Sequence, residues 1–156
     1  MKKFLSFIGK VILMLVVVAF ALDFIYTLIY SKATGRNKIE YVINTTSKTY
    51  DVIMLGSSRA NNHFDPKIFE DKGYKAFNFG MSGSRLQESA LLLQLMMDNS
   101  YKIKNIILEV DLNINSEGYS EGTRALFMPY LRNNKTISDY YKNTIANSKC
   151  LKVIPF

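Results

Sequence analysis

The sequence predicts an α/β protein in which an N-terminal transmembrane helix precedes a parallel-sheet domain. Three observations lead to this fold class. The stretch from Val11 to Tyr30 is 20 residues long, and its one charged residue is Asp23. Three short apolar runs follow later in the chain, and segments with apolar residues at helical spacing lie between them. Apolar strands that alternate with helices form a parallel sheet covered by helices on both faces.

The apolar N-terminal stretch has the length that a helix needs to cross about 30 Å of hydrocarbon. Tyr26 and Tyr30 lie near its far end, where amphipathic rings favour the membrane interface. We expect an uncleaved anchor over residues 1–30. A cleaved signal peptide with its site at 31–33 and a buried helix of a soluble domain are the alternatives.

The charges on either side of this helix do not by themselves set its orientation. Three basic residues precede it and three follow it: Lys2, Lys3 and Lys10, then Lys32, Arg36 and Lys38. The free amine of the N-terminus favours the cytoplasm for the short basic end. We therefore expect a single-pass protein of the bacterial inner membrane whose soluble domain is extracytoplasmic.

Composition limits the partners of the soluble part. The chain has 156 residues, of which 48% are hydrophobic, and this excludes a disordered protein. The net charge is +7, but the basic residues are scattered and form no cluster that would predict a nucleic-acid partner. A basic protein near an anionic membrane surface fits better, so the lipid bilayer is the expected partner. The single cysteine, Cys150, and the absence of a Cys/His cluster predict neither a metal nor a cofactor.

Residues 31–50 are polar and mixed and predict a linker, so the domain is expected over 51–156. In that domain each apolar run predicts a strand, and each is followed by turn residues. Asp65 and Pro66 resemble the start of a helix, with Asp65 as the N-cap. The predicted strands are 51–55, 74–79 and 104–110; the predicted helices are 65–72, 84–98 and one from Thr136 or Ser138 to about Ser148; 111–122 is a polar loop.

Right-handed crossovers place the carboxyl ends of all three strands at one edge of the sheet, where open α/β folds form their sites. The residues predicted there are 56–59, 78–83 and 109–113. A serine just past a strand can present its hydroxyl, and nearby backbone N–H groups can bind an oxyanion. The same residues can also be structural: Gly-Ser-Ser as a plain turn, the glycines for positive φ, and the asparagines for loop backbone.

Two of these segments carry a resemblance to a known family. Asp51 to Arg59, with Gly56-Ser57-Ser58, resembles the first conserved block of the SGNH/GDSL hydrolase superfamily in its membrane-linked form. Residues 78–83 resemble the second block, and 109–113 occupy the third. The resemblance covers roughly 51–131. It implies the amino-terminal part of a three-layer, flavodoxin-like fold.

The resemblance also implies roles for single residues. Ser58 would be the nucleophile. Gly80 and Asn113 would donate to the oxyanion, with Gly83 as the alternative to Gly80. Asn113 departs from the family pattern, because 111–114 read Asp-Leu-Asn-Ile where the family has Gly-x-Asn-Asp. The remaining candidates, placed at the substrate, are Arg59, Asn78 and Gly83.

The family's acid-base pair, D-x-x-H, does not occur in the sequence, and its one histidine is His63. Serine needs an adjacent base to act as a nucleophile. We therefore expect the sequence to be the N-terminal part of a longer esterase or O-acyltransferase of envelope glycans or lipid-linked carbohydrate. A cell-surface polysaccharide or an acyl donor is then the expected partner besides the bilayer. The alternatives are a non-catalytic envelope binding protein and an inactive fragment.

Overall fold

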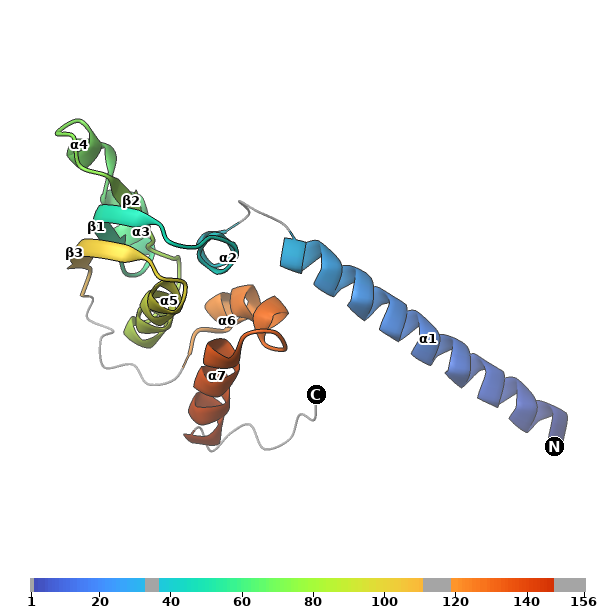
Figure 1. The fold of residues 1–156 in the computed structure, drawn as a ribbon. Helices are drawn as coiled ribbons and strands as arrows, with labels where there is room; N and C mark the ends of the chain where they lie inside the picture. Colours follow the sequence, from blue (N-terminus) through green and yellow to red (C-terminus); the bar gives the residue numbers. More distant parts are fainter. Residues whose placement is uncertain (1, 33–36, 111–118, 148–156) are drawn as a thin grey trace. The chain divides into compact units, whose positions relative to one another are not determined.

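The computed structural model describes residues 2–32, 37–110 and 119–147 of the chain (Figure 1). The chain divides into two compact units, Met1–Ala33 and Thr34–Phe156. The first is a single helix. The second holds a small sheet and six α-helices within the described residues.

The first unit is helix α1, Lys2–Lys32, which is 31 residues long. Its stretch Lys3–Ile29 has a mean hydropathy of 2.6 and is long and apolar enough to cross a membrane. At 1.5 Å per residue these 27 residues span about 40 Å, more than the hydrocarbon core. Large apolar side chains are exposed all round the helix, as at Leu15 and Phe20, which is the pattern of a membrane span.

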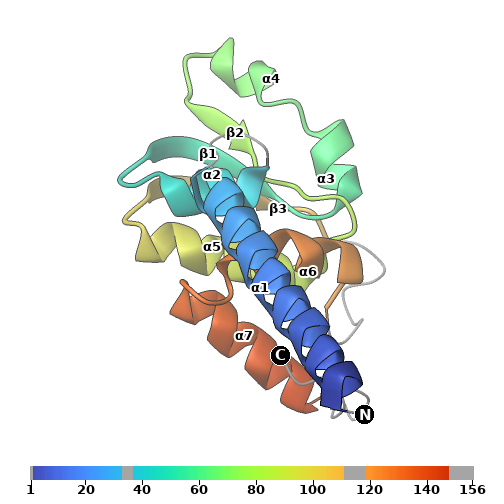
Figure 2. The same cartoon turned by 90° about the vertical axis from the view of Figure 1, so that its right-hand side faces the viewer.

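The second unit contains a parallel sheet of three strands in the order β2-β1-β3 (Figures 1 and 2). Ile53 of the central strand pairs with Phe77 on one side and with Ile106 on the other. The predicted parallel sheet is confirmed, and each strand bound lies within two residues of its prediction. The strands are β1 Thr49–Leu55, β2 Ala76–Asn78 and β3 Lys102–Leu108.

Helices cover both faces of this sheet. On one face, Ile53 and Leu55 of β1 belong to an apolar cluster that includes Leu92 and Leu95 of α5. On the other face, Val52 and Met54 pack with Ala76 of β2. Phe64 and Phe69, which lie in and around the α3–α4 segment, pack against this cluster. The helices are α2 Lys38–Asn44, α3 Ser58–His63, α4 Lys67–Glu70, α5 Leu86–Asp98, α6 Glu121–Phe127 and α7 Lys135–Asn147; a 3-10 turn, η2, spans Met128–Tyr130.

The structure corrects two predictions about these helices. Residues 38–44 of the predicted linker form α2, whose Ile39 and Val42 are fully buried in the core. The predicted helix over 65–72 is a single turn, α4, capped by Pro66; the Asp65 carboxylate accepts from the Lys67 backbone N–H at 2.9 Å. Helix α6 and the turn after it had no counterpart in the prediction.

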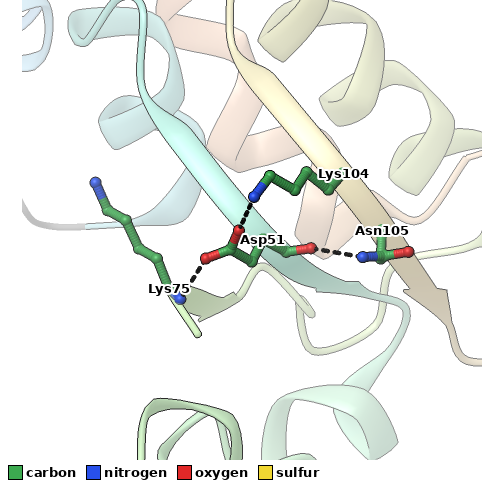
Figure 3. Close-up of polar contacts among 4 residues, drawn as sticks. All are labelled: Asp51, Lys75, Lys104 and Asn105. Carbon is green, nitrogen blue, oxygen red and sulfur yellow. Dashed lines mark hydrogen bonds and ion pairs between the residues drawn. The ribbon is translucent and has the colours of Figure 1, made fainter. Parts of the chain in front are cut away.

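Asp51 of β1 joins the central strand to both of its neighbours (Figure 3). Its carboxylate accepts from the Lys75 backbone N–H at 2.8 Å and pairs with Lys104 Nζ at 2.6 Å. Its carbonyl accepts from Asn105 Nδ2 at 3.1 Å. The hydrogen bond from Lys104 is the main reason that the pKa of the Asp51 carboxyl lies below its usual value. Asp51 thus fixes the sheet away from the edge that carries the candidate site.

Candidate functional site

The carboxyl ends of the three strands meet at one edge of the sheet, as predicted. The Gly56 carbonyl, just past β1, accepts from the Met81 backbone N–H at 2.9 Å and from Ser84 Oγ at 2.8 Å. The Leu55 carbonyl accepts from the backbone N–H of Glu109 at 2.9 Å. The segments that follow β2 and β3 are therefore held directly against the end of β1.

Ser57 is fixed by Glu109. Glu109 Oε2 accepts from the Ser57 backbone N–H at 2.9 Å and from Ser57 Oγ at 2.8 Å. Ser57 Oγ also accepts from the Arg59 backbone N–H at 3.3 Å, so Ser57 is the N-cap of α3. The Ser57 hydroxyl therefore donates one hydrogen bond and accepts another, and both bonds fix the first turn of α3.

The turn before Ser57 requires glycine. Gly56 has φ +144°, which side chains rarely adopt, and a Cβ there would lie 2.7 Å from Glu109 Cβ. Gly56 therefore allows the Glu109 carboxylate to reach Ser57. The result is a tight strand-to-helix turn with Ser58 as its first helical residue.

Ser58 differs from Ser57 in its hydrogen bonding. It is half-buried at the first position of α3. Among the side chains that the structure describes, none hydrogen-bonds to its hydroxyl. A serine hydroxyl at the carboxyl edge of a parallel sheet, with its donor uncommitted, is the geometry that a nucleophile needs.

Asn78 is a structural residue in this arrangement. Its buried Nδ2 donates to the carbonyls of Ala60 at 2.7 Å and Phe64 at 2.8 Å, and its Oδ1 accepts from the Gly80 backbone N–H at 2.8 Å. These bonds tie the end of β2 to the middle of α3 and to its C-cap. The amide group of Asn78 is thus occupied inside the protein, and its predicted role in binding substrate stays a prediction.

The two glycines of the second segment, Gly80 and Gly83, differ in what their backbone conformation and surroundings require. The Gly80 N–H already donates to Asn78, so it does not point to an oxyanion in this structure. A Cβ at Gly80 would lie 2.6 Å from the Asn61 backbone nitrogen, so glycine there permits close packing on α3. Gly83 is exposed and has φ +77°, which confirms the alternative that it permits a positive φ.

Arg59 and His63 both lie exposed on α3. Five residues separate Ser58 from His63, which places them about 7.5 Å apart along a helix axis and about 140° apart around it. His63 therefore cannot take the proton of Ser58 within this helix. Asn113, the remaining predicted oxyanion donor, lies outside the described residues.

Lys38 of α2 reaches this edge from a distant part of the sequence. Its Nζ donates to Asn61 Oδ1 and to the Gly80 carbonyl, each at 2.6 Å. Burial lowers the pKa of its ammonium below the usual lysine value. Lys38 thus joins α2, α3 and the segment after β2 through neutral acceptors.

Two of these residues were not identified as site residues from the sequence. The prediction placed Glu109 at the carboxyl edge, within residues 109–113, but gave it no role. Lys38 gave no such signal, because 42 residues separate it from Gly80. Glu109 contacts Ser57, and Lys38 contacts Asn61 and Gly80, so both residues lie at the turn and helix that carry Ser58.

In the described ranges, no group of three or more His, Cys, Asp and Glu residues is placed to hold a metal ion. The functional groups that the described residues bring to this edge are a serine hydroxyl, an amine and a carboxylate. In comparisons with known proteins, no family model, no curated protein and no solved structure matches the chain.

Proposed function

We propose that the protein is a membrane-anchored serine esterase or O-acyltransferase of the SGNH type. One observation carries this proposal: the Ser58 hydroxyl, which has no hydrogen-bond partner among the described residues, lies at the carboxyl edge of a parallel sheet, on a turn fixed by Gly56 and Glu109. The order Gly-Ser-Ser after β1 and Asn-Phe-Gly-Met-Ser-Gly at β2 supports the family assignment. The reaction is acyl transfer through an ester on Ser58.

The anchor supports a role at the membrane. Helix α1 is long and apolar enough to span it, and we place the protein in a bacterial inner membrane with the second unit outside. Acceptors available there are the hydroxyls of envelope polysaccharides and lipid-linked carbohydrate. Water or such a hydroxyl then releases the acyl group from Ser58.

The decisive experiment uses the full chain in lipid nanodiscs and a fluorophosphonate probe, which forms a covalent bond with activated serines. We expect labelling of the wild type and of Ser138→Ala, a variant in α7, and none of Ser58→Ala. Peptide mass spectrometry should place the adduct on Ser58. An unlabelled wild type that keeps its tyrosine circular dichroism would exclude the serine mechanism.

A non-catalytic binding role on the envelope is the second candidate. The observation that favours it is the Gly80 N–H, which is occupied by Asn78 and gives no oxyanion donor. In that case the chain should bind envelope glycan equally well with serine or alanine at position 58, and the probe should leave it unmodified. Glycan co-sedimentation of nanodiscs carrying each variant separates the two functions.

A further inference from the structure

We propose that Lys38, Asn61 and Asn62 form a subsite that binds a phosphate group of the substrate, an inference that rests on the proposed function for its place beside Ser58. The three side chains form a chain of hydrogen bonds at the exposed surface of α3. Both amide oxygens of this chain accept bonds from within it, and each of its three residues keeps at least one N–H. An ionised phosphate, with negative charge and several acceptor oxygens, is the complement of such a surface.

The positive charge of Lys38 has only neutral partners. Its Nζ donates to Asn61 Oδ1 and to the Gly80 carbonyl, each at 2.6 Å. An ammonium has three N–H donors, so one remains after these two bonds. Among the described residues no carboxylate pairs with it: α3 has no acidic residue, the Glu40 side chain of α2 is fully buried, and Glu109 is bound to the turn after β1.

Lys38 also sets the direction of the two amides. Because an ammonium can only donate, Asn61 turns its oxygen to Lys38 and its Nδ2 away from it. Asn61 Nδ2 then donates to Asn62 Oδ1 at 3.0 Å. The NH₂ group of Asn62 is thereby left as the open end of the chain. A charge at one end thus orders donors along the surface of α3.

The subsite lies one helical turn from Ser58. Ser58 and Asn61 are three residues apart in α3, so they share a face and their Cβ atoms are about 5–6 Å apart. A phosphate held by Lys38 and Asn61 therefore lies beside the serine without occupying it. A substrate with an ester at Ser58 can place its phosphate there from a neighbouring part of the same molecule.

The charge and geometry of Lys38 favour phosphate over carboxylate. Lysine binds phosphate as a point charge, whereas the planar fork of arginine matches a carboxylate. Burial disfavours the charged amine and lowers the pKa of Lys38, and a bound anion would offset that cost. Phosphate of this kind occurs in phosphorylated glycans and in lipid headgroups, and the test separates these two sources.

The test uses the full chain in micelles of an alkyl maltoside, a detergent without charge or phosphate. The melting temperature, followed by tyrosine circular dichroism, is measured with increasing inorganic phosphate at constant ionic strength. A ligand that binds the folded form raises the melting temperature with a concentration dependence set by its Kd. We expect this rise in the wild type and in Lys72→Met, a change in an exposed turn, and no comparable rise with acetate.

Three variants separate binding from support of the fold. Asn61→Asp keeps the oxygen that faces Lys38 and replaces the NH₂ group by negative charge, so it should keep the fold and weaken phosphate binding about 10- to 100-fold. Lys38→Met should weaken it as much. Lys38→Arg keeps the charge and should bind within about tenfold of the wild type. The readout is the phosphate-dependent rise, which a variant that only loses stability retains.

The source of the phosphate is tested by adding phosphatidylglycerol to the micelles. If the lipid protects only variants with an intact subsite and removes the effect of inorganic phosphate, the ligand is a lipid headgroup. If inorganic phosphate still protects in its presence, the ligand is a phosphate on a soluble substrate. Either result requires the subsite and supports it.

Equal phosphate-dependent rises in the wild type, Asn61→Asp and Lys38→Met would overturn the subsite, and equal protection by acetate would overturn its assignment to phosphate. The measurement involves no reaction, so its failure differs from failure of the proposed function. Phosphate binding without fluorophosphonate labelling of Ser58 would refute acyl transfer and leave the subsite. Labelling of Ser58 without a phosphate effect would refute the subsite alone.

Discussion

Glu109 binds Ser57 through both the backbone and the side chain, with Oε2 2.9 Å from the nitrogen and 2.8 Å from Oγ. The contact joins the end of β3 to the turn after β1 across 52 residues of sequence. It is therefore a tertiary constraint on the residue next to Ser58.

The Ser57–Glu109 contact should appear as a coupling energy. Ser57→Ala removes the helix cap and should cost about 1 kcal/mol of unfolding free energy. Glu109→Ala leaves the Ser57 N–H without its acceptor and should cost about 1–3 kcal/mol. Because the two variants remove one shared hydrogen bond, the double variant should lose less than the sum, by about 0.5 kcal/mol or more. Denaturant unfolding followed by tyrosine circular dichroism measures this, and strictly additive losses would contradict the contact.

Asn78→Asp should destabilise the second unit strongly. Nδ2 of Asn78 donates to backbone carbonyls, and a carboxylate oxygen in its place would face those same oxygens. Lost bonds and the carbonyls left unpaired should together cost about 1–3 kcal/mol or more. Asn62→Asp, an exposed change on α3, is the control and should stay within about 0.5 kcal/mol of the wild type. If Asn78→Asp unfolds like the wild type and only labelling changes, Asn78 binds substrate after all.

Glu40→Met should stabilise the protein. Glu40 is fully buried, and within the described residues neither carboxylate oxygen has a hydrogen-bond partner. Replacing a buried unpaired polar group by an apolar side chain of similar size should raise the unfolding free energy by about 1–3 kcal/mol. The same change at the exposed Glu70 should have little effect. A loss of stability in Glu40→Met would show that this carboxylate has a partner in the working protein.

The ion pair of Asp51 should give stability a pH dependence in acid. The folded pKa of Asp51 lies below its unfolded value of about 3.9, so its contribution is present above that pH. The contribution is lost as the pH falls through the folded pKa. The difference in melting temperature between wild type and Asp51→Asn should therefore be constant from about pH 5 to 7 and shrink below about pH 4. In a Lys104→Met background Asp51 has lost its ion-pair partner, so the effect of Asp51→Asn on the melting temperature should be smaller. A difference in melting temperature that does not change with pH would exclude the ion pair as its source.

Charges placed in the middle of α1 should release the protein from the membrane. Arginine at the centre of a span costs about 2.5–3.5 kcal/mol per residue, so Leu15→Arg with Val18→Arg should abolish stable insertion. Phe4→Arg, near the end of the helix, should be tolerated because its side chain reaches the interface. Alkaline carbonate extraction of membranes distinguishes the two. Retention of the double variant in the pellet would mean that α1 is not the anchor.

The sequence was sufficient for the sheet but not for everything around it. The runs that became β1 and β3 are apolar and end in turn residues, so their direction and their shared edge followed from general rules. Helix α2 was missed because its seven residues lie between polar segments, and two apolar residues three apart, Ile39 and Val42, are a weak signal. The buried positions of these two residues are set by α5, far along the chain.

The site was predictable only in part, for a similar reason. Ser58 could be placed by its distance from a strand end, which is a local property. The occupation of Gly80 by Asn78 and the approach of Lys38 depend on the path of the chain between elements. A motif reports which residues follow a strand, but it does not report which hydrogen bonds those residues have already made.

The outer edge of β3 has a consequence for how the protein can be produced and stored. Among the described strands it pairs on one side only, with β1, and open edges recruit foreign strands. The first half of this edge carries the exposed Lys102 and Lys104, whose charges oppose such pairing. Its second half continues into exposed Ile106, Leu108 and Val110. We therefore expect recombinant protein to aggregate by strand pairing at this second half of β3. Leu108→Lys should reduce that aggregation in concentrated samples.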